Sequence, residues 1–352
     1  MQNYGSAINF VNFLIEKAHG SGASDIHLEP QARDLRIRFR VDGLLEDREA
    51  IPLAVHPEII SRLKIMSGLR TDEHRIAQDG RFRTTVNGAD LDMRISVVPT
   101  HYGENAVLRL LSRRQEGELG LRALGFSETN KSLVEQALRK TQGLILITGP
   151  TGSGKTTTLY TLLQMLNRPA TSIITIEDPI EYAIPGIQQI QTNTQRGLNF
   201  ANGLRSILRQ DPDIIMVGEI RDQETARLAV NAALTGHLLL STLHTNSSAA
   251  TLPRLLDLGV EPYLIAATAR LIVNQRLVRK LQDNGFAGRT TIQEVLAIDD
   301  TLRNAISQRL SLHRLQQAAE KAGMASIYTD GLAKVEQGIT TLEEILRVVE
   351  YE

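Results

Sequence analysis

The stretch Gly143–Leu166 constrains this chain more than any other part of its sequence. It reads GLILITGPTGSGKTTTLYTLLQML, which is a short apolar run, a glycine-rich loop and an amphipathic helix. The loop, Gly149–Thr156, fits the pattern G-x4-G-K-[ST] in the strand–loop–helix context that a phosphate-binding loop (P-loop) requires. An ordinary glycine-rich turn needs neither the flanking strand nor the helix. We therefore predict a nucleoside triphosphate site here.

The residues of the P-loop have different expected roles. Glycines let backbone N–H groups turn inward around the phosphates, and the helix N-terminus adds partial positive charge. We expect Lys155 to reach the β- and γ-phosphates of ATP and the Thr156 hydroxyl to ligate Mg²⁺. The predicted ATP-binding residues are Gly149, Pro150, Thr151, Gly152, Ser153, Gly154, Lys155, Thr156 and Thr157.

Apolar runs alternate with helical segments from about residue 127 onward, which predicts an α/β fold with a doubly wound parallel sheet. The runs are Leu144–Ile147, Ile173–Ile176, Ile214–Val217 and Leu238–Leu240. They are followed by the P-loop, by Glu177, by Glu219 and by a segment that contains His244. In open parallel sheets ligands bind beyond the carboxyl ends of the strands, so we expect these groups to converge on the triphosphate.

Glu219 is the first candidate for polarising the attacking water or for holding Mg²⁺ through water, and Glu177 is the alternative base. Gly218 stands where such sites commonly have an aspartate. Glu219 could instead be a helix-capping acid. His244 could contact the γ-phosphate, or it could be a core histidine.

Residues 1–112 predict a smaller α+β domain with an antiparallel sheet. Helical patterns run from Ala7 to Ala18 and from His56 to Met66, and two hairpins turn at Asp42-Gly43 and Asn87-Gly88. On the first hairpin an arginine face, made of Arg36, Arg38 and Arg40, is either a solvated sheet face or part of a phosphate site.

Arg81 and Arg94 lie near the ends of the second hairpin. The stretch Ser112–Gly120 is polar, charged and contains glycine, and residues 113–126 are predicted to be the interdomain linker, which suits a hinge. We therefore expect the N-terminal domain to bring both guanidinium groups to the phosphates as catalytic arginines.

Residues 127–352 form the predicted ATPase domain, of which 281–352 is expected to be a helical C-terminal subdomain. Arg270, Arg276, Arg279 and Lys280 are expected on a helix as a solvated or subunit-facing surface.

The net charge of −1 does not favour nucleic acid as a partner. The chain has no cysteine, so disulfides and Cys-ligated zinc are excluded, which agrees with a reducing compartment. No export signal or membrane-spanning run is apparent, and any membrane association is expected through partners.

The motifs together resemble the secretion ATPases of the type II secretion and type IV pilus assembly family. The resemblance covers essentially the whole chain, in family order. Besides the P-loop, the matching segments are ASDIHLEP at Ala23–Pro30, RVDG at Arg40–Gly43, QDGR at Gln78–Arg81, the Asp box at Ile176–Glu181, the glycine-containing Walker B segment through Gly218–Thr225, the His box at Thr242–Thr245 and QRLVRKL at Gln275–Leu281.

The resemblance implies a RecA-like P-loop core, a PAS-like N-terminal domain and a hexameric Mg²⁺-dependent ATPase at the cytoplasmic side of the inner membrane. Its implied partner is an inner-membrane platform protein that adds pilin or pseudopilin subunits. Alternatives are a competence-pilus or retraction ATPase, a nucleic-acid translocase and a nucleotide-gated scaffold.

Two departures from the family stand out. The tetracysteine zinc module that many members carry after QRLVRKL cannot form, because Leu281 leads without any cysteine to Arg289. No zinc is therefore expected. The chain also starts at the family's second N-terminal domain, as expected of a natural short form or a shortened version of a longer protein.

Overall fold

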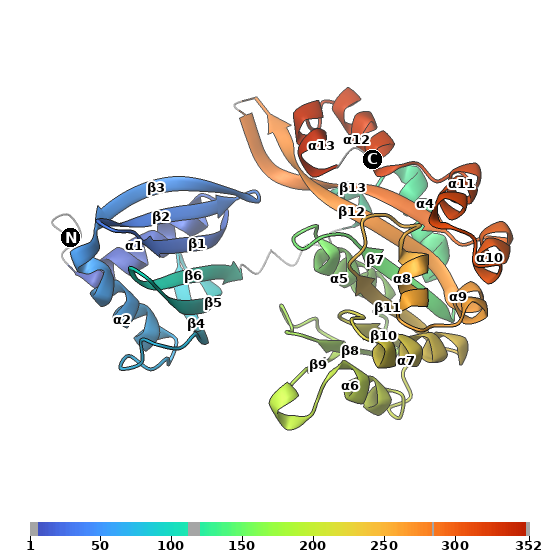
Figure 1. Ribbon diagram of the computed structural model, residues 1–352, viewed down its shortest axis with the longest axis horizontal. Coiled ribbons are helices and arrows are strands. Elements are labelled where there is room, and N and C mark those ends of the chain that lie inside the picture. The colour runs from blue at the N-terminus through green and yellow to red at the C-terminus, as the bar shows by residue number, and fades with distance from the viewer. Residues whose placement is uncertain (1–5, 112–119, 284, 350–352) are drawn as a thin grey trace. The chain divides into compact units, whose positions relative to one another are not determined.

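The computed structural model describes residues 6–111, 120–283 and 285–349 (Figure 1). The chain divides into two compact units, Met1–Gly117 and Glu118–Glu352, and each has its own hydrophobic core. Across the described ranges, no helix combines the length and the apolar character needed to cross a membrane.

The first unit is a six-stranded antiparallel sheet whose core is closed by two helices (Figure 1). The strand order is β3-β2-β1-β6-β5-β4. The strands are β1 (Ala23–Pro30), β2 (Asp34–Val41), β3 (Leu44–Pro52), β4 (Gln78–Val86), β5 (Ala89–Thr100) and β6 (Gly103–Leu111), and the helices are α1 (Ala7–Gly20) and α2 (His56–Met66), the latter preceded by a short 3-10 turn, η1 (Leu53–Val55). The predicted α+β fold with an antiparallel sheet is confirmed.

Both predicted hairpin turns are present, and their backbone angles explain the residues used. Asp42 and Gly43 have φ of 48° and 90°, and Asn87 and Gly88 have φ of 50° and 80°. Positive φ at both central residues defines a type I′ turn, which matches the right-handed twist of the strands that it connects. Asn, Asp and Gly tolerate this conformation best.

The second unit is built on a seven-stranded sheet of order β13-β12-β7-β11-β10-β8-β9. All neighbours are parallel except β12 and β13. The strands are β7 (Gly143–Thr148), β8 (Ile173–Glu177), β9 (Gln188–Gln191), β10 (Ile214–Val217), β11 (Leu238–Leu243), β12 (Ala269–Gln282) and β13 (Gly285–Ala297). The helices are α3 (Leu121–Leu124), α4 (Glu128–Leu138), α5 (Lys155–Leu166), η2 (Thr194–Arg196), α6 (Phe200–Ile207), α7 (Gln223–Leu234), α8 (Thr251–Asp257), α9 (Pro262–Thr268), α10 (Asp300–Ser307), α11 (Leu312–Lys321), α12 (Ile327–Glu336) and α13 (Leu342–Val348).

Strand β7 shows why this sheet is covered on both faces. Leu144 and Leu146 belong to one core cluster, and Ile145 and Ile147 belong to another. Successive strand residues point to opposite faces, so the two clusters lie on opposite sides of the sheet. Helices α6, α7, α9 and α10 contribute to the first cluster, and α3, α4 and α5 to the second. The doubly wound α/β prediction is confirmed, and the four apolar runs are β7, β8, β10 and β11.

The prediction of a purely helical chain after Leu281 was wrong. Residues Gly285–Ala297 form β13, which pairs antiparallel with β12, and helices begin only at α10. The basic stretch from Arg270 to Lys280 lies on β12 and not on a helix. β12 is held on one side by β7 and on the other by β13, and this pairing outweighs the helix-like spacing of the arginines.

The expected linker 113–126 lies partly outside the described residues. Its end, which is described, does not behave as a linker. Leu121 and Leu124 on α3 are 2% and 8% exposed, and both belong to the core of the second unit. Burial of their side chains ties this segment to the ATPase unit.

Candidate nucleotide site

The P-loop joins β7 to α5 in the context that the sequence predicted. Gly149 and Gly154 have φ of 137° and 89°, which are backbone conformations that residues other than glycine rarely adopt. A Cβ atom on Gly149 would lie 2.5 Å from the backbone oxygen of Gln275 and 2.7 Å from Ser153 Oγ. The neighbouring strand β12 therefore leaves no room for a side chain at the start of the loop.

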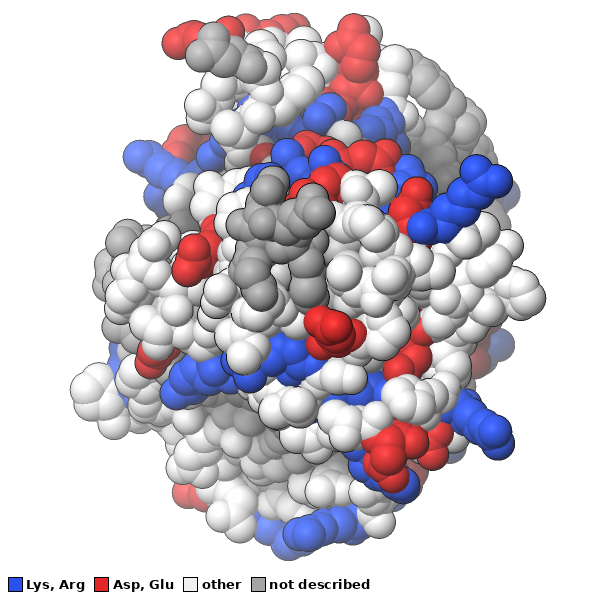
Figure 2. All heavy atoms as spheres, turned by 90° about the vertical axis from the view of Figure 1, so that its left-hand side faces the viewer, with Lys and Arg blue, Asp and Glu red and all other residues white. Residues whose placement is uncertain are grey.

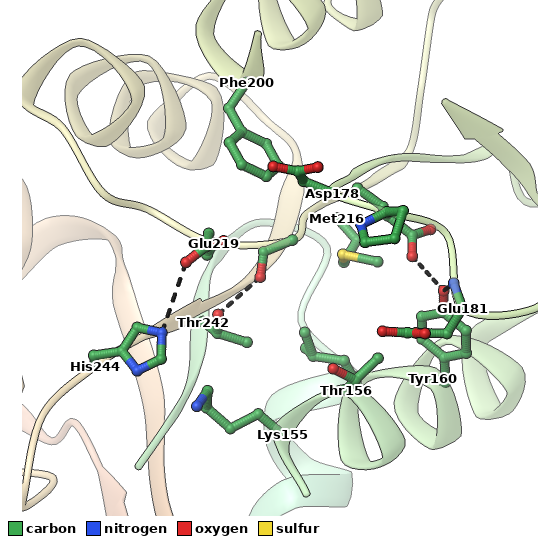
Figure 3. A pocket seen from close by; sticks show the side chains of 14 residues that line it. Lys155, Thr156, Tyr160, Asp178, Glu181, Phe200, Met216, Glu219, Thr242 and His244 are labelled. Atoms are coloured by element: carbon green, nitrogen blue, oxygen red, sulfur yellow. Dashed lines mark hydrogen bonds and ion pairs between the residues drawn. The ribbon is translucent and has the colours of Figure 1, made fainter. Parts of the chain in front are cut away.

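A cavity lies at the carboxyl ends of β7, β8, β10 and β11 (Figure 3). It is lined by Lys155, Thr156, Leu159, Tyr160, Glu177, Asp178, Pro179, Glu181, Phe200, Met216, Gly218, Glu219, Thr242 and His244. Among the predicted site residues, Lys155, Thr156, Glu177, Glu219 and His244 are thus brought together. The other predicted ATP-binding residues form the loop and the start of α5 but do not line this cavity.

Lys155 is folded back onto its own loop. Its ammonium group donates hydrogen bonds of 2.9 Å to the backbone oxygens of both Gly149 and Pro150. Burial lowers the pKa of Lys155 from 10.5 to about 8, and Glu219 opposes this shift while Arg276 adds to it. Phosphate oxygens would offer the ammonium group full negative charge in place of the two carbonyl dipoles.

We expect the affinity for a non-hydrolysable ATP analogue to fall as the pH rises from about 8 to about 10, by up to about tenfold per pH unit. Above its lowered pKa the free Lys155 side chain is neutral, so binding must take up a proton. Phosphate groups lose their second proton at about pH 6, so their titration lies below this pH window and does not cause the effect. Equilibrium titrations at several pH values would measure the effect.

Lys155→Arg is the control for this pH dependence, because a guanidinium group stays protonated throughout the window. The slope should flatten in this variant even if its affinity is lower. A wild-type affinity that stays constant over the window would contradict the expectation.

Glu219 lies at the carboxyl end of β10 and is 13% exposed. One of its oxygens lies 2.6 Å from Arg221 Nη2, and the other lies 3.6 Å from His244 Nε2. Burial and the charge of Lys155 lower the pKa of His244 below its ordinary value, so the imidazole is neutral at pH 7. Arg221 thus holds one oxygen of Glu219 closely, and the other oxygen faces the neutral His244 imidazole at a longer distance.

Glu177 is held differently, although it also lines the cavity. It is 3% exposed and accepts hydrogen bonds from the Tyr160 hydroxyl, from Thr175 Oγ1 at 2.6 Å and from Gln189 Nε2 at 3.0 Å. Burial, with the hydrogen bond to Glu177, raises the pKa of Tyr160, so this hydroxyl stays protonated and donates. Glu177 thus joins α5, β8 and β9. These hydrogen bonds favour a structural role for Glu177, in which its carboxylate holds the three elements together, over the role of a general base.

Sequence reasoning missed several residues that line the cavity. Tyr160 follows Thr156 by one helical turn, so helical periodicity could have found it. Asp178 and Glu181 belong to the same Asp box as Glu177 and could have been included on that ground. Phe200 also lines the cavity, but no sequence signal pointed to it. Met216 lies in the predicted apolar run Ile214–Val217 and could have been included because that run ends at the site.

The donor atoms in the cavity fit Mg²⁺. This ion prefers oxygen ligands, and it usually takes one or two carboxylates, substrate phosphates and several waters. The Thr156 hydroxyl and the Glu219 carboxylate are such oxygens. Within the described residues, no three or more His, Cys, Asp or Glu side chains are grouped to enclose a metal ion.

Arg81 and Arg94 lie in the first unit, whereas the cavity belongs to the second. Arg81 on β4 is directly opposite Arg94 on β5, and Arg94 is opposite Arg109 on β6. Arg109 Nε lies 2.9 Å from Asp25 Oδ1. Arg81 and Arg94 place two guanidinium groups directly opposite each other, and because like charges repel in a sheet, this arrangement favours binding of an anion.

The arginines of the first hairpin also have partners within the first unit. Arg36 Nε lies 2.7 Å from Asp47 and Arg38 Nη2 lies 2.5 Å from Glu29. Arg40 Nη1 donates a 2.8 Å hydrogen bond to the backbone oxygen of Gly43. These contacts favour the solvated-face interpretation for the first hairpin.

The chain is similar to known secretion and pilus proteins over nearly its whole length. The family model described as "Type II/IV secretion system protein" matches residues 1–347. The type II secretion system protein E of Xanthomonas campestris pv. campestris is 47% identical over 97% of this chain and 67% of its own length. The type IV pilus assembly ATPase PilB of Myxococcus xanthus is 42% identical over 96% of this chain and 67% of its own length.

A solved structure is also similar. The pilus retraction motor PilT, crystallised with bound ADP, has a TM-score of 0.70 and is 30% identical, over 97% of each chain. The combination of a smaller antiparallel unit and a P-loop unit is therefore found in a known motor protein.

Proposed function

The chain belongs to the type II/IV secretion system protein family, and from this premise we propose that it is a Mg²⁺-dependent ATPase that powers pilus or pseudopilus assembly. The observation that carries the proposal is the cavity in which Lys155 and Thr156 meet Glu219 and His244 (Figure 3). It joins the P-loop after β7 to a carboxylate after β10, two strands away in the same sheet, and these are the parts that ATP hydrolysis requires.

Each of these residues has a role that follows from its position. Lys155 exchanges its two carbonyl partners for the β- and γ-phosphate oxygens. Thr156 and Glu219 would hold Mg²⁺, Glu219 through water, and the ion would supply positive charge that offsets the charge of the phosphates. Glu219 also accepts a proton from the attacking water, and neutral His244 donates a hydrogen bond to the γ-phosphate.

We further propose that Arg81 and Arg94 complete the site when the N-terminal unit closes over bound ATP. Charge builds on the γ-phosphoryl oxygens during transfer, and guanidinium groups neutralise it well. The direct opposition of Arg81 and Arg94 on β4 and β5 supports this role, because the two neighbouring guanidinium groups would repel each other less around a polyanion.

The proposed working form is a homohexamer at the cytoplasmic side of the inner membrane, where it would move a platform membrane protein. The name of one relative, the type IV pilus assembly ATPase PilB, supports a role in pilus assembly, and that of another, type II secretion system protein E, supports a role in secretion. A retraction or competence-pilus motor is the alternative within the family. The higher identity to the assembly ATPase, 42% against 30% for PilT, favours assembly.

A nucleic-acid translocase is the main alternative of another class. Figure 2 shows acidic and basic side chains interspersed on the face that it presents, in keeping with the net charge of −1. Such a surface does not favour a polyanionic strand. Single-stranded DNA and RNA should therefore leave the rate of ATP hydrolysis unchanged, whereas strong stimulation would favour the translocase.

Glu219→Gln should retain ATP affinity and slow hydrolysis by about 10²-fold or more, because the amide cannot accept the proton. Glu177→Gln should slow hydrolysis less. Its carboxylate already accepts hydrogen bonds from Tyr160, Thr175 and Gln189. Nucleotide binding and steady-state phosphate release of both variants test this order. A larger loss in Glu177→Gln would move the role of base to Glu177.

A further inference from the structure

Strand β12 continues past the end of β7 and lies alongside the P-loop. It pairs with β7 as far as Asn274, which is opposite Thr148, the last residue of β7. Asn274 and Gln275 are both 0% exposed. A buried amide is costly unless its donors and acceptors are bonded, so the partners of these two side chains indicate what they hold.

The Gln275 amide connects the P-loop to α5. Its Nε2 donates a 2.8 Å hydrogen bond to the backbone oxygen of Ser153, and its Oε1 accepts a 2.9 Å hydrogen bond from Thr158 Oγ1. A Cβ atom on Gly154 would lie 3.1 Å from Gln275 Nε2, so the amide is packed against the loop.

This contact fixes the orientation of one peptide group. The carbonyl of Ser153 and the N–H of Gly154 belong to the same planar peptide and point in opposite directions. Holding the carbonyl against β12 therefore directs the N–H of Gly154 away from β12. That N–H is one of the donors with which a P-loop surrounds phosphate oxygens.

Asn274 holds a different loop, because successive strand residues point to opposite faces. Its Nδ2 donates hydrogen bonds of 2.9 Å to Thr148 Oγ1 and 3.0 Å to the backbone oxygen of Thr245. Its Oδ1 accepts a 2.9 Å hydrogen bond from Arg276 Nη1. Asn274 thus ties the end of β7 to the residue that follows His244.

We propose that Gln275 and Asn274 are positioning residues of the nucleotide site. Gln275 sets the phosphate-facing orientation of the Ser153–Gly154 peptide, and Asn274 holds the His244 loop against the strand that leads into the P-loop. The inference rests on the proposed nucleotide site and adds to it two residues that touch no substrate. It predicts different effects of the two side chains, on binding and on turnover.

Gln275→Glu keeps the shape of the side chain but places a carboxylate oxygen against the carbonyl of Ser153. Its Kd for ADP, measured by calorimetry, should rise by about tenfold or more. Asn274→Asp keeps the acceptor for Arg276 and loses the donor to Thr148 and Thr245. Its kcat should fall by about tenfold, while its Kd for ADP changes by less than about threefold.

The matched control is Gln293→Glu. Gln293 lies on β13 directly opposite Gln275, is also 0% exposed, and directs its amide to Thr291. This variant should lower the melting temperature and leave the Kd for ADP and kcat unchanged. If Gln275→Glu does not fold, Thr158→Val removes the donor on the other side of the same amide and should weaken ADP binding in the same direction.

A Kd for ADP equal to that of the wild type in both Gln275→Glu and Thr158→Val would overturn the role of Gln275. An equal loss in Gln293→Glu would do so as well, because it would show a general effect of burying a carboxyl group. Asn274→Asp with unchanged kcat would overturn the role of Asn274. Failure of the wild-type chain to bind ADP would instead overturn the nucleotide site itself.

Discussion

Lys155→Ala should lower ATP turnover by about 10²–10³-fold or more, and it should also weaken nucleotide binding. The substitution removes the cavity's ammonium group, which now rests on the backbone oxygens of Gly149 and Pro150. Alanine leaves the phosphates without this positive charge. His244 cannot supply it, because its imidazole is neutral. Phosphate release and calorimetric titration with ATP analogue would measure both losses.

Lys140→Ala is the matched control for this variant. Lys140 lies in the same unit, is exposed and does not line the cavity. Its removal changes the net charge by the same amount and should leave turnover near the wild-type rate. Wild-type turnover in Lys155→Ala would contradict the P-loop assignment.

Arg81→Ala and Arg94→Ala should each bind ATP and assemble normally, yet hydrolyse ATP about 10³-fold more slowly. The expected loss is this large because an arginine delivered to the γ-phosphate acts mainly on the transition state. ATP-analogue binding, the oligomeric state and steady-state turnover should be measured together, since the proposal predicts a change in the last alone.

Arg83→Ala is the control on the same strand. Arg83 is two residues from Arg81 and therefore on the same face of β4, but its Nε already lies 2.8 Å from Asp92. It should turn over ATP at nearly the wild-type rate. Turnover near normal in both Arg81→Ala and Arg94→Ala would return these residues to the solvated face of the sheet.

Mixing Arg94→Ala chains with Lys155→Ala chains would tell whether an arginine serves its own subunit or the next. Each variant alone should be inactive. Activity can reappear in mixed rings only where the arginine of one subunit completes the P-loop of another. Mixed rings without activity would indicate that each subunit uses its own arginines.

The structure could be predicted from the sequence where it depends on residues close together in the chain. Asp42-Gly43 and Asn87-Gly88 each favour positive φ at two adjacent positions, and each forms the expected hairpin turn. The buried parallel strands were recognisable because β7, β8, β10 and β11 are short apolar runs. Their common sheet then explains why Lys155, Glu219 and His244 line one cavity.

Strand β13 could not be predicted in the same way, because its buried polar residues depend on distant partners. The N–H of Gln293 donates to Asp330 at 2.8 Å, and Glu294 accepts a 2.7 Å hydrogen bond from the N–H of Ser248. Burial raises the pKa of Glu294, a cost that no local pattern reveals. Residues of this kind look like loop or surface positions in a single sequence.

The division of roles between the two glutamates was beyond the sequence for the same reason. Glu177 and Glu219 both follow apolar runs, and the preference for Glu219 came without knowledge of the side chains that contact either carboxylate. The partners of Glu177 come from α5 and β9, and those of Glu219 are Arg221 and His244. The role of Gln275 could not be predicted either, because its contact with Ser153 joins residues that are 122 positions apart in the chain.

The most direct test of the proposed ATPase is multiple-turnover phosphate release by the assembled wild-type chain with ATP and Mg²⁺. We predict continuous release that stops when Mg²⁺ is chelated and resumes when Mg²⁺ is added back, at a rate that single-stranded DNA does not change. Assembled chains that bind ATP but release no phosphate beyond a single turnover would contradict the proposal and would favour a nucleotide-gated scaffold.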